Sequence, residues 1–194
     1  MTIYTTPFLF LKVHFLQKNL VIWFIPATIS LVVVSLTYWL SIDVAISGQD
    51  GLLSQLTTLL TIAGGFFVTS LTLLLTNDHP VLNSYFVGEP KPHIVSETEP
   101  LTRKRFLSLL FGYLSSLSFA LVAVCLLLNL FASSLMNLFQ TEIFDFAKAV
   151  AGFALVFIML HVGSLALVGL HYLTDRLHRA DGRSRFTKAK SQHD

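Results

Sequence analysis

Cysteine and charged residues are both scarce in this chain of 194 residues. The single cysteine, Cys125, cannot form an intrachain disulfide, so the fold does not depend on one. Only 12% of the residues are charged, against about 25% in an ordinary soluble domain, and 54% are hydrophobic. This composition excludes an ordinary soluble protein and indicates a membrane protein.

Charged residues are missing altogether from four long stretches of the sequence. The uncharged blocks contain 24, 27, 36 and 26 residues and lie at 19–42, 51–77, 106–141 and 149–174. A helix needs about 20 apolar residues to cross about 30 Å of hydrocarbon, so each block suffices for one span and is too short for two. The predicted fold class is therefore all-α, a polytopic membrane protein with a bundle of four transmembrane helices.

The four spans are predicted at about 19–41, 53–76, 104–132 and 147–176, within a transmembrane domain at 19–176. We expect the first span to be retained and not cleaved as a signal peptide, because its apolar run exceeds the usual length of about 7 to 15 residues. An outer-membrane barrel is not expected, because its strands would alternate in polarity and these blocks do not.

The basic residues predict the orientation of the spans. Of 13 Lys and Arg residues, all but Lys148 lie before the first span, between the second and third spans, or after the fourth. Basic residues favour the cytoplasmic side, so both termini and the middle loop are predicted to be cytoplasmic.

Three segments lie outside the predicted spans on the cytoplasmic side. Residues 1–18 are compatible with a helix in the membrane interface and equally with an extension of the first span. The middle loop, 77–103, contains prolines that exclude a long helix, together with apolar residues to bury. It is expected to be a lid packed under the bundle or a docking surface for a partner, and a mobile connector is the alternative. Residues 177–194 are predicted to form a basic, solvated tail near anionic lipid.

The second span carries hydroxyl and glycine residues at helical spacing. Their steps of three or four residues place them in one stripe along the helix, formed by Thr58, Thr61, Gly65, Thr69, Thr72 and Thr76. Spans associate in lipid through close backbone approach and hydrogen bonds, so the stripe is predicted to face protein. Because small residues occur on all four spans, we also expect a homo-oligomer. The sharper alternative is that the stripe lines a water-filled pore.

His161 lies near the middle of the fourth predicted span, on one face with Ser164. An ionisable group at that depth is costly and is a functional candidate by default. A neutral imidazole could donate to a threonine hydroxyl or to a backbone carbonyl exposed by glycine. A proton-responsive or permeation role is the alternative. Asn129, near the outer end of the third span, is expected to make an interhelical hydrogen bond.

Catalytic chemistry is not expected. Intramembrane enzymes need clustered reactive groups, and the predicted spans hold one deeply placed histidine and no deeply placed carboxylate. We expect no cofactor, no metal ion and no direct binding of nucleic acid. Transport by inverted repeats is also disfavoured, because no repeat is visible.

The arrangement of spans, the loop NDHPVLNSYFVGEPKPH and the tail RLHRADGRSRFTKAK resemble the membrane subunit of Kiwa-type bacterial anti-phage systems. The resemblance covers nearly the whole chain and is one of layout. It implies an inner-membrane homo-oligomer that responds to phage attack and works with a cytoplasmic, DNA-binding partner subunit. No functional residue of the family can be carried over to a position in this sequence.

Three functions follow as hypotheses. The first is a non-enzymatic, oligomeric membrane sensor or scaffold of an anti-phage defence complex, which engages a cytoplasmic partner through its loop and tail. Its predicted docking residues are Tyr85, Phe86, Arg103, Lys104 and Arg105. The second is a small ion channel lined by the threonine stripe, and the third is a small-molecule transporter.

Overall fold

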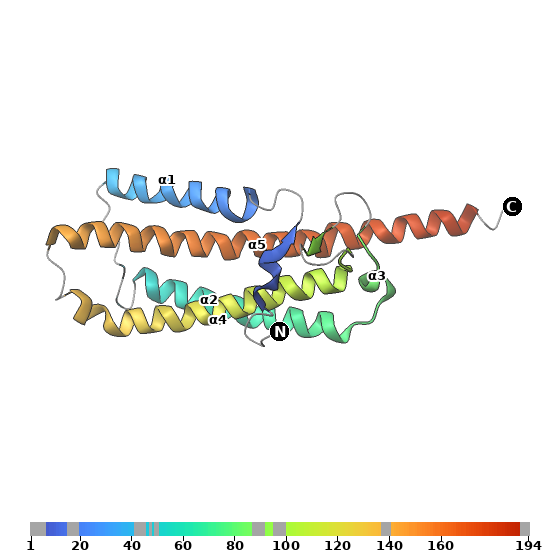
Figure 1. Ribbon diagram of the computed structural model, residues 1–194, viewed down its shortest axis with the longest axis horizontal. Coiled ribbons are helices and arrows are strands. Elements are labelled where there is room, and N and C mark those ends of the chain that lie inside the picture. Colours follow the sequence, from blue (N-terminus) through green and yellow to red (C-terminus); the bar gives the residue numbers. More distant parts are fainter. Residues whose placement is uncertain are drawn as a thin grey trace. The chain divides into compact units, whose positions relative to one another are not determined.

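The computed structural model describes residues 7–14, 20–40, 46, 48, 51–86, 92–94, 100–136 and 141–190 (Figure 1). Four of its helices are long and apolar enough to cross a membrane, with spans at Ile22–Trp39, Leu52–Thr76, Arg103–Phe131 and Ala149–Leu173. The predicted fold class, an all-α bundle of four membrane-spanning helices, is confirmed. The cytoplasmic position of the termini stays a prediction.

The long helices agree with the predicted spans at most ends and overrun them at others. A π-helical turn, η3 (Leu20–Phe24), leads into α1 (Ile25–Trp39), and α2 covers Leu52–Thr76. Helix α4 (Arg103–Met136) runs past the predicted end at residue 132.

Helix α5 (Thr141–Lys190) begins before and ends well beyond the predicted span at 147–176. Its 50 residues correspond to about 75 Å, more than twice the hydrocarbon thickness. The predicted span ended where charges resume, but a helix outside lipid tolerates Arg and Lys well. The backbone of the predicted tail is therefore helical as far as Lys190, and residues 191–194 lie outside the described residues.

The chain divides into two compact units, and α2, α4 and α5 each contribute to both. The first unit combines Met1–Lys18, Phe67–Tyr113 and Leu165–Asp194. The second combines Asn19–Phe66 and Leu114–Ser164.

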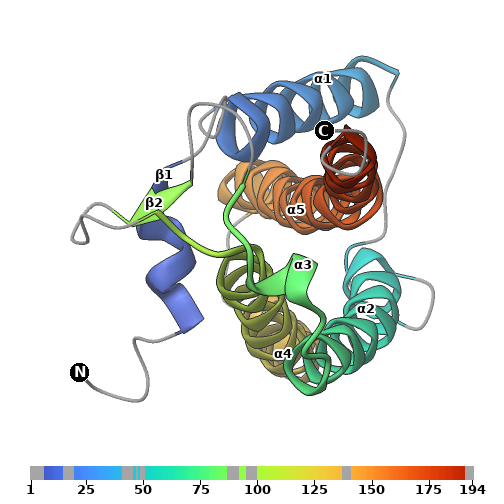
Figure 2. The ribbon, with the colours of Figure 1, turned by 90° about the vertical axis from the view of Figure 1, so that its right-hand side faces the viewer.

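In the first unit, the N-terminal segment pairs with the middle loop. A short 3-10 helix, η2 (Pro7–Lys12), is followed by β1 (Val13–His14), which pairs antiparallel with β2 (His93–Ile94) of the loop (Figure 2). The register places Val13 opposite Ile94. The predicted extension of the first span is wrong for residues 7–14, because Phe10 and Val13 are buried and the backbone there turns into a strand. Residues 7–12 are helical only as the 3-10 helix η2, and the interfacial position of this segment stays a prediction.

Aromatic rings form the centre of the first unit. The Phe106 ring on α4 lies 5.5 Å from Phe86 of the loop, 4.9 Å from Tyr172 of α5 and 6.0 Å from Phe10 of η2, between ring centroids. The loop also contains a one-turn helix, α3 (Pro80–Asn83), whose Leu82 is buried. The described part of the loop is packed, as expected of a lid, because its apolar side chains complete this core. Its role as a docking surface and its mobility stay predictions.

In the second unit, α2 packs through large apolar residues and one glycine. Its buried positions step by three or four residues, at Leu53, Leu56, Leu60 and Gly64. A Cβ atom at Gly64 would lie 3.3 Å from the Cβ atom of Ser118 on α4, so the absent side chain allows the two helices to approach closely. Helix α1 runs beside the first part of α5 in both Figure 1 and Figure 2. The buried residues of η3 and α1 are Ile22, Pro26 and Ser30, which step by four.

Candidate functional site

The threonine stripe of α2 points away from the rest of the chain. All six of its members are exposed, and nothing lies within 4 Å of the position that a Cβ atom at Gly65 would take. The prediction that this stripe packs against other helices of the chain is wrong. The physical reason is that leucine side chains and Gly64 occupy the packed face of α2, which leaves the threonines on other faces.

The hydroxyl groups of the stripe bond to their own helix. The Oγ1 of Thr61 donates to the carbonyl of Thr57 at 2.8 Å, and that of Thr72 donates to the carbonyl of Val68 at 2.9 Å. Thr58 and Thr76 make the same bond one turn back, at 3.1 and 3.0 Å. These bonds satisfy the hydroxyl hydrogens inside an apolar medium and leave oxygen lone pairs available on the outer face.

The two adjacent glycines of α2 provide a matched test of which face of this helix packs within the chain. Gly64→Leu should lower the free energy of unfolding by about 1–3 kcal/mol, because the new side chain must force α2 and α4 apart. Gly65→Leu should change the free energy of unfolding of the single, unassembled chain by less than about 0.5 kcal/mol, because no other part of the chain lies near this position. Unfolding of the two variants in mixed micelles measures the difference, and equal losses would contradict the assigned orientation.

His161 links α5 to the start of the first span. Its side chain is buried, and its Nδ1 lies 2.9 Å from the backbone oxygen of Ile22. A carbonyl oxygen can only accept, so Nδ1 carries the hydrogen. Pro26, four residues after Ile22, has no N–H to donate to this carbonyl. The imidazole therefore supplies a donor to a carbonyl that has no N–H four residues further along the chain.

Aromatic rings hold the imidazole in place. The ring of Trp23 lies 5.4 Å from that of His161, and the ring of Phe157 is stacked on it at 6.0 Å. The predicted structural role of His161 as a donor to a backbone carbonyl agrees with this geometry. The prediction that a glycine exposes this carbonyl is wrong, because the residue that leaves it without an N–H four residues on is Pro26. A proline within an apolar span is the signal in the sequence that could have located the partner.

Two other predicted polar residues have only local roles. Ser164 donates from its Oγ to the carbonyl of His161, one turn back on the same helix, at 3.0 Å. Asn129 accepts at its Oδ1 from the backbone N–H of Gly48 at 3.5 Å. Gly48 lies in the connection between α1 and α2, so the expected bond from Asn129 to another helix is wrong. Asn129 lies near the end of its span, close to the connection that contains Gly48.

The predicted docking residues separate into buried and exposed groups. Phe86 and Arg103 are buried in the first unit, with the Arg103 guanidinium 5.8 Å from the centre of the Phe86 ring. They are part of the core, so their prediction as docking residues is wrong. Tyr85 is 49% exposed and Arg105 is also exposed, so both side chains lie at the surface.

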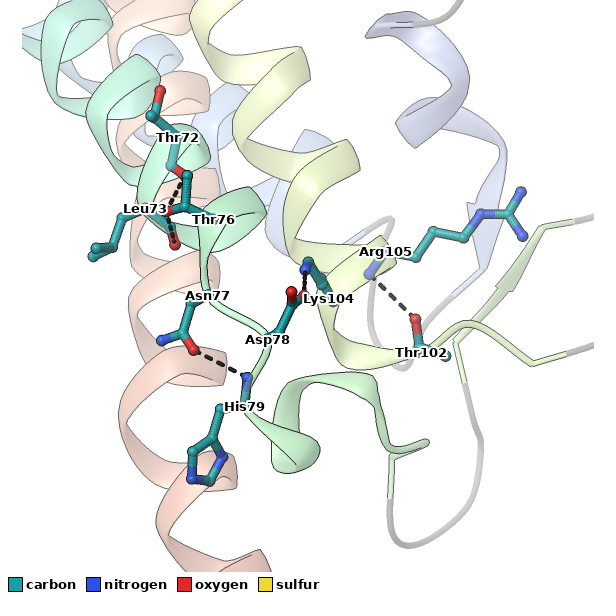
Figure 3. Close-up of polar contacts among 9 residues, drawn as sticks. All are labelled: Thr72, Leu73, Thr76, Asn77, Asp78, His79, Thr102, Lys104 and Arg105. Atoms are coloured by element: carbon teal, nitrogen blue, oxygen red, sulfur yellow. Dashed lines mark hydrogen bonds and ion pairs between the residues drawn. The ribbon is translucent and has the colours of Figure 1, made fainter.

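Lys104 ties the start of α4 to the end of α2. Its Nζ lies 2.7 Å from a carboxylate oxygen of Asp78 (Figure 3). The hydrogen bond and the charge of Lys104 hold the pKa of Asp78 below its ordinary value. In the same view, Arg105 extends away from Asp78, while its backbone N–H donates to the Thr102 hydroxyl at 3.3 Å. Lys104 is therefore engaged in an ion pair within the chain, and the Arg105 side chain is exposed.

Comparison with known proteins adds no family or fold relative. No family model, curated protein or solved structure matches the chain. Among the described residues, no three side chains of His, Cys, Asp or Glu are grouped so that they could hold a metal ion.

Proposed function

We propose that this membrane protein is a non-enzymatic scaffold that assembles with copies of itself through the threonine stripe of α2. The outward position of the stripe is the observation that carries the proposal. In lipid, helices associate where small and hydroxyl-bearing residues allow close backbone approach. The chain uses Gly64 for such an approach within itself and leaves Gly65 and the threonines for another copy.

A cytoplasmic partner is the second part of the proposal. The N-terminal segment, the loop and the start of α4 share one aromatic core, which supports a stable surface on this side of the membrane. Tyr85 and Arg105 lie on the outside of that core and are the residues proposed to meet the partner. The layout shared with Kiwa-type membrane subunits favours a DNA-binding subunit of an anti-phage complex in the bacterial inner membrane as that partner.

Purification of the native complex in detergent tests the partner proposal. The wild-type chain should carry a second protein whose mass adds to that of the assembled copies, and a double variant with Tyr85→Ala and Arg105→Glu should lose it. A matched control, Asn83→Ala, changes an exposed side chain of the same loop and should retain the partner. Retention of every bound protein by the double variant would reject this docking surface.

An ion channel is the second candidate, favoured by the outward lone pairs of the threonine hydroxyls. Copies arranged with their stripes facing a common axis would line a polar path. Exchanging Thr61, Thr69 and Thr72 for valine keeps the shape and removes the hydroxyls, so liposome conductance should fall sharply only if this candidate is correct.

A further inference from the structure

The N-terminal 3-10 helix η2 has two dissimilar sides. Phe10, near its middle, and Val13, directly after it, are fully buried. Phe8 and Leu11, three residues apart and therefore on one side of a 3-10 helix, are 44% and 36% exposed. Lys12, at its end, is also exposed. The segment is thus fixed to the protein by one side and presents apolar residues followed by a positive charge on the other.

The exposed side continues the surface of a membrane span. The ring of Phe8 meets Tyr113 of α4 edge-on, with ring centroids 5.9 Å apart. Tyr113 belongs to the candidate span Arg103–Phe131 and lies about 15 Å along the helix axis from its start. A ring in contact with this part of α4 is beside the apolar region that crosses the membrane. Phe8 therefore lies beside an apolar span of the first unit, and Leu11 shares its exposed side of η2.

The chemistry of the three side chains matches the boundary of an anionic leaflet. Apolar side chains favour the acyl region, and the long stem of a lysine can remain in apolar surroundings while its ammonium reaches the headgroups. Each basic residue near an anionic surface contributes about 1 kcal/mol of attraction. A binding surface for a folded protein would need a larger apolar area than two side chains offer.

We propose that η2 is a lipid-binding wedge, in which Phe8 and Leu11 enter the leaflet and Lys12 binds the phosphate groups of anionic phospholipids. Phe10 and the β1–β2 pair hold the wedge at a fixed position in the first unit. The lipid composition on this side of the membrane then affects the stability of the core of the first unit, which also supports Tyr85 and Arg105. This inference does not depend on the proposed assembly or partner.

A single fluorescent label tests the wedge in the full-length chain. In a background with Cys125→Ala, a cysteine is introduced as Leu11→Cys, or as Asn83→Cys for a matched control on the exposed side of α3. Each variant is labelled with nitrobenzoxadiazole and placed in nanodiscs of phosphatidylcholine, alone or mixed equally with phosphatidylglycerol. Nanodiscs leave both faces of the bilayer open to the aqueous quencher iodide, and nitroxide-bearing lipids quench from within the bilayer.

The label at position 11 should be quenched several-fold more by nitroxide lipids than the label at position 83, and several-fold less by iodide. Phosphatidylglycerol should increase the difference in quenching between positions 11 and 83. The variant Lys12→Gln should abolish that increase. A label at position 11 that iodide reaches as readily as the label at position 83 would overturn the proposal. Shielding from both quenchers would also overturn it, because protein and not lipid would then cover the wedge.

Discussion

Phe106→Ala should lower the free energy of unfolding by about 3–5 kcal/mol, because it removes the central ring of the first unit and leaves a cavity. The Phe106 side chain is completely buried and contacts rings from η2, the loop and α5. The loss should also release the strand pairing of Val13 with Ile94. Amide hydrogen exchange in β1 and unfolding in mixed micelles measure the two effects.

Phe131→Ala is the matched control for this prediction. Phe131 lies on the same helix, α4, and its side chain is 54% exposed, so its removal leaves no internal cavity. The expected change is within about 0.5 kcal/mol. If the two alanine variants unfold alike and β1 keeps its protection in both, the N-terminal segment and the loop do not share the core described here.

His161→Phe should lower the free energy of unfolding by about 1–3 kcal/mol, because it leaves the carbonyl of Ile22 without its donor in an apolar environment. Phenylalanine keeps a ring beside Trp23 and Phe157, so the change isolates the hydrogen bond from the stacking. Pro26→Ala restores a backbone N–H four residues after Ile22. The cost of His161→Phe should therefore become much smaller in the Pro26→Ala background.

A double-mutant cycle in mixed micelles measures this coupling between positions 26 and 161. The single change Pro26→Ala should leave the fold intact, since alanine is a good helix former. Additive effects of the two substitutions would contradict the idea that the imidazole supplies the donor that Pro26 lacks. The same cycle with Ser164→Ala in place of Pro26→Ala is the control, because Ser164 donates to the carbonyl of His161 and not to that of Ile22.

The membrane-spanning helices were predictable because their cause is local. A stretch without charges long enough to cross the hydrocarbon must be helical to satisfy its backbone groups, so 53–76 and Leu52–Thr76 agree almost to the residue. The ends of α5 were not predictable in the same way. Charge marks where a span leaves the lipid, and it does not mark where the helix ends.

The faces of the helices depend on tertiary contacts that no single span encodes. The stripe from Thr58 to Thr76 has the composition of a packing face, but Leu53, Leu56 and Leu60 compete for the interior and bury more apolar surface. The pairing of His14 with His93 joins segments about 80 residues apart, which no local pattern reveals. For the same reason, Phe86 could be recognised as a residue to bury or to dock, and only the contacts with Phe106 and Tyr172 decide between these roles.

Disulfide crosslinking between copies in native membranes tests the proposed assembly most directly. In a Cys125→Ala background, a cysteine is introduced as Thr61→Cys on the stripe or as Ile62→Cys at the next position, which is exposed on a different side of α2. Oxidation should join copies that carry Thr61→Cys and leave those with Ile62→Cys as single chains. If neither variant forms a crosslink, and a lipid-soluble thiol reagent modifies position 61 as fast as position 62, then the stripe faces lipid and the scaffold does not assemble through it.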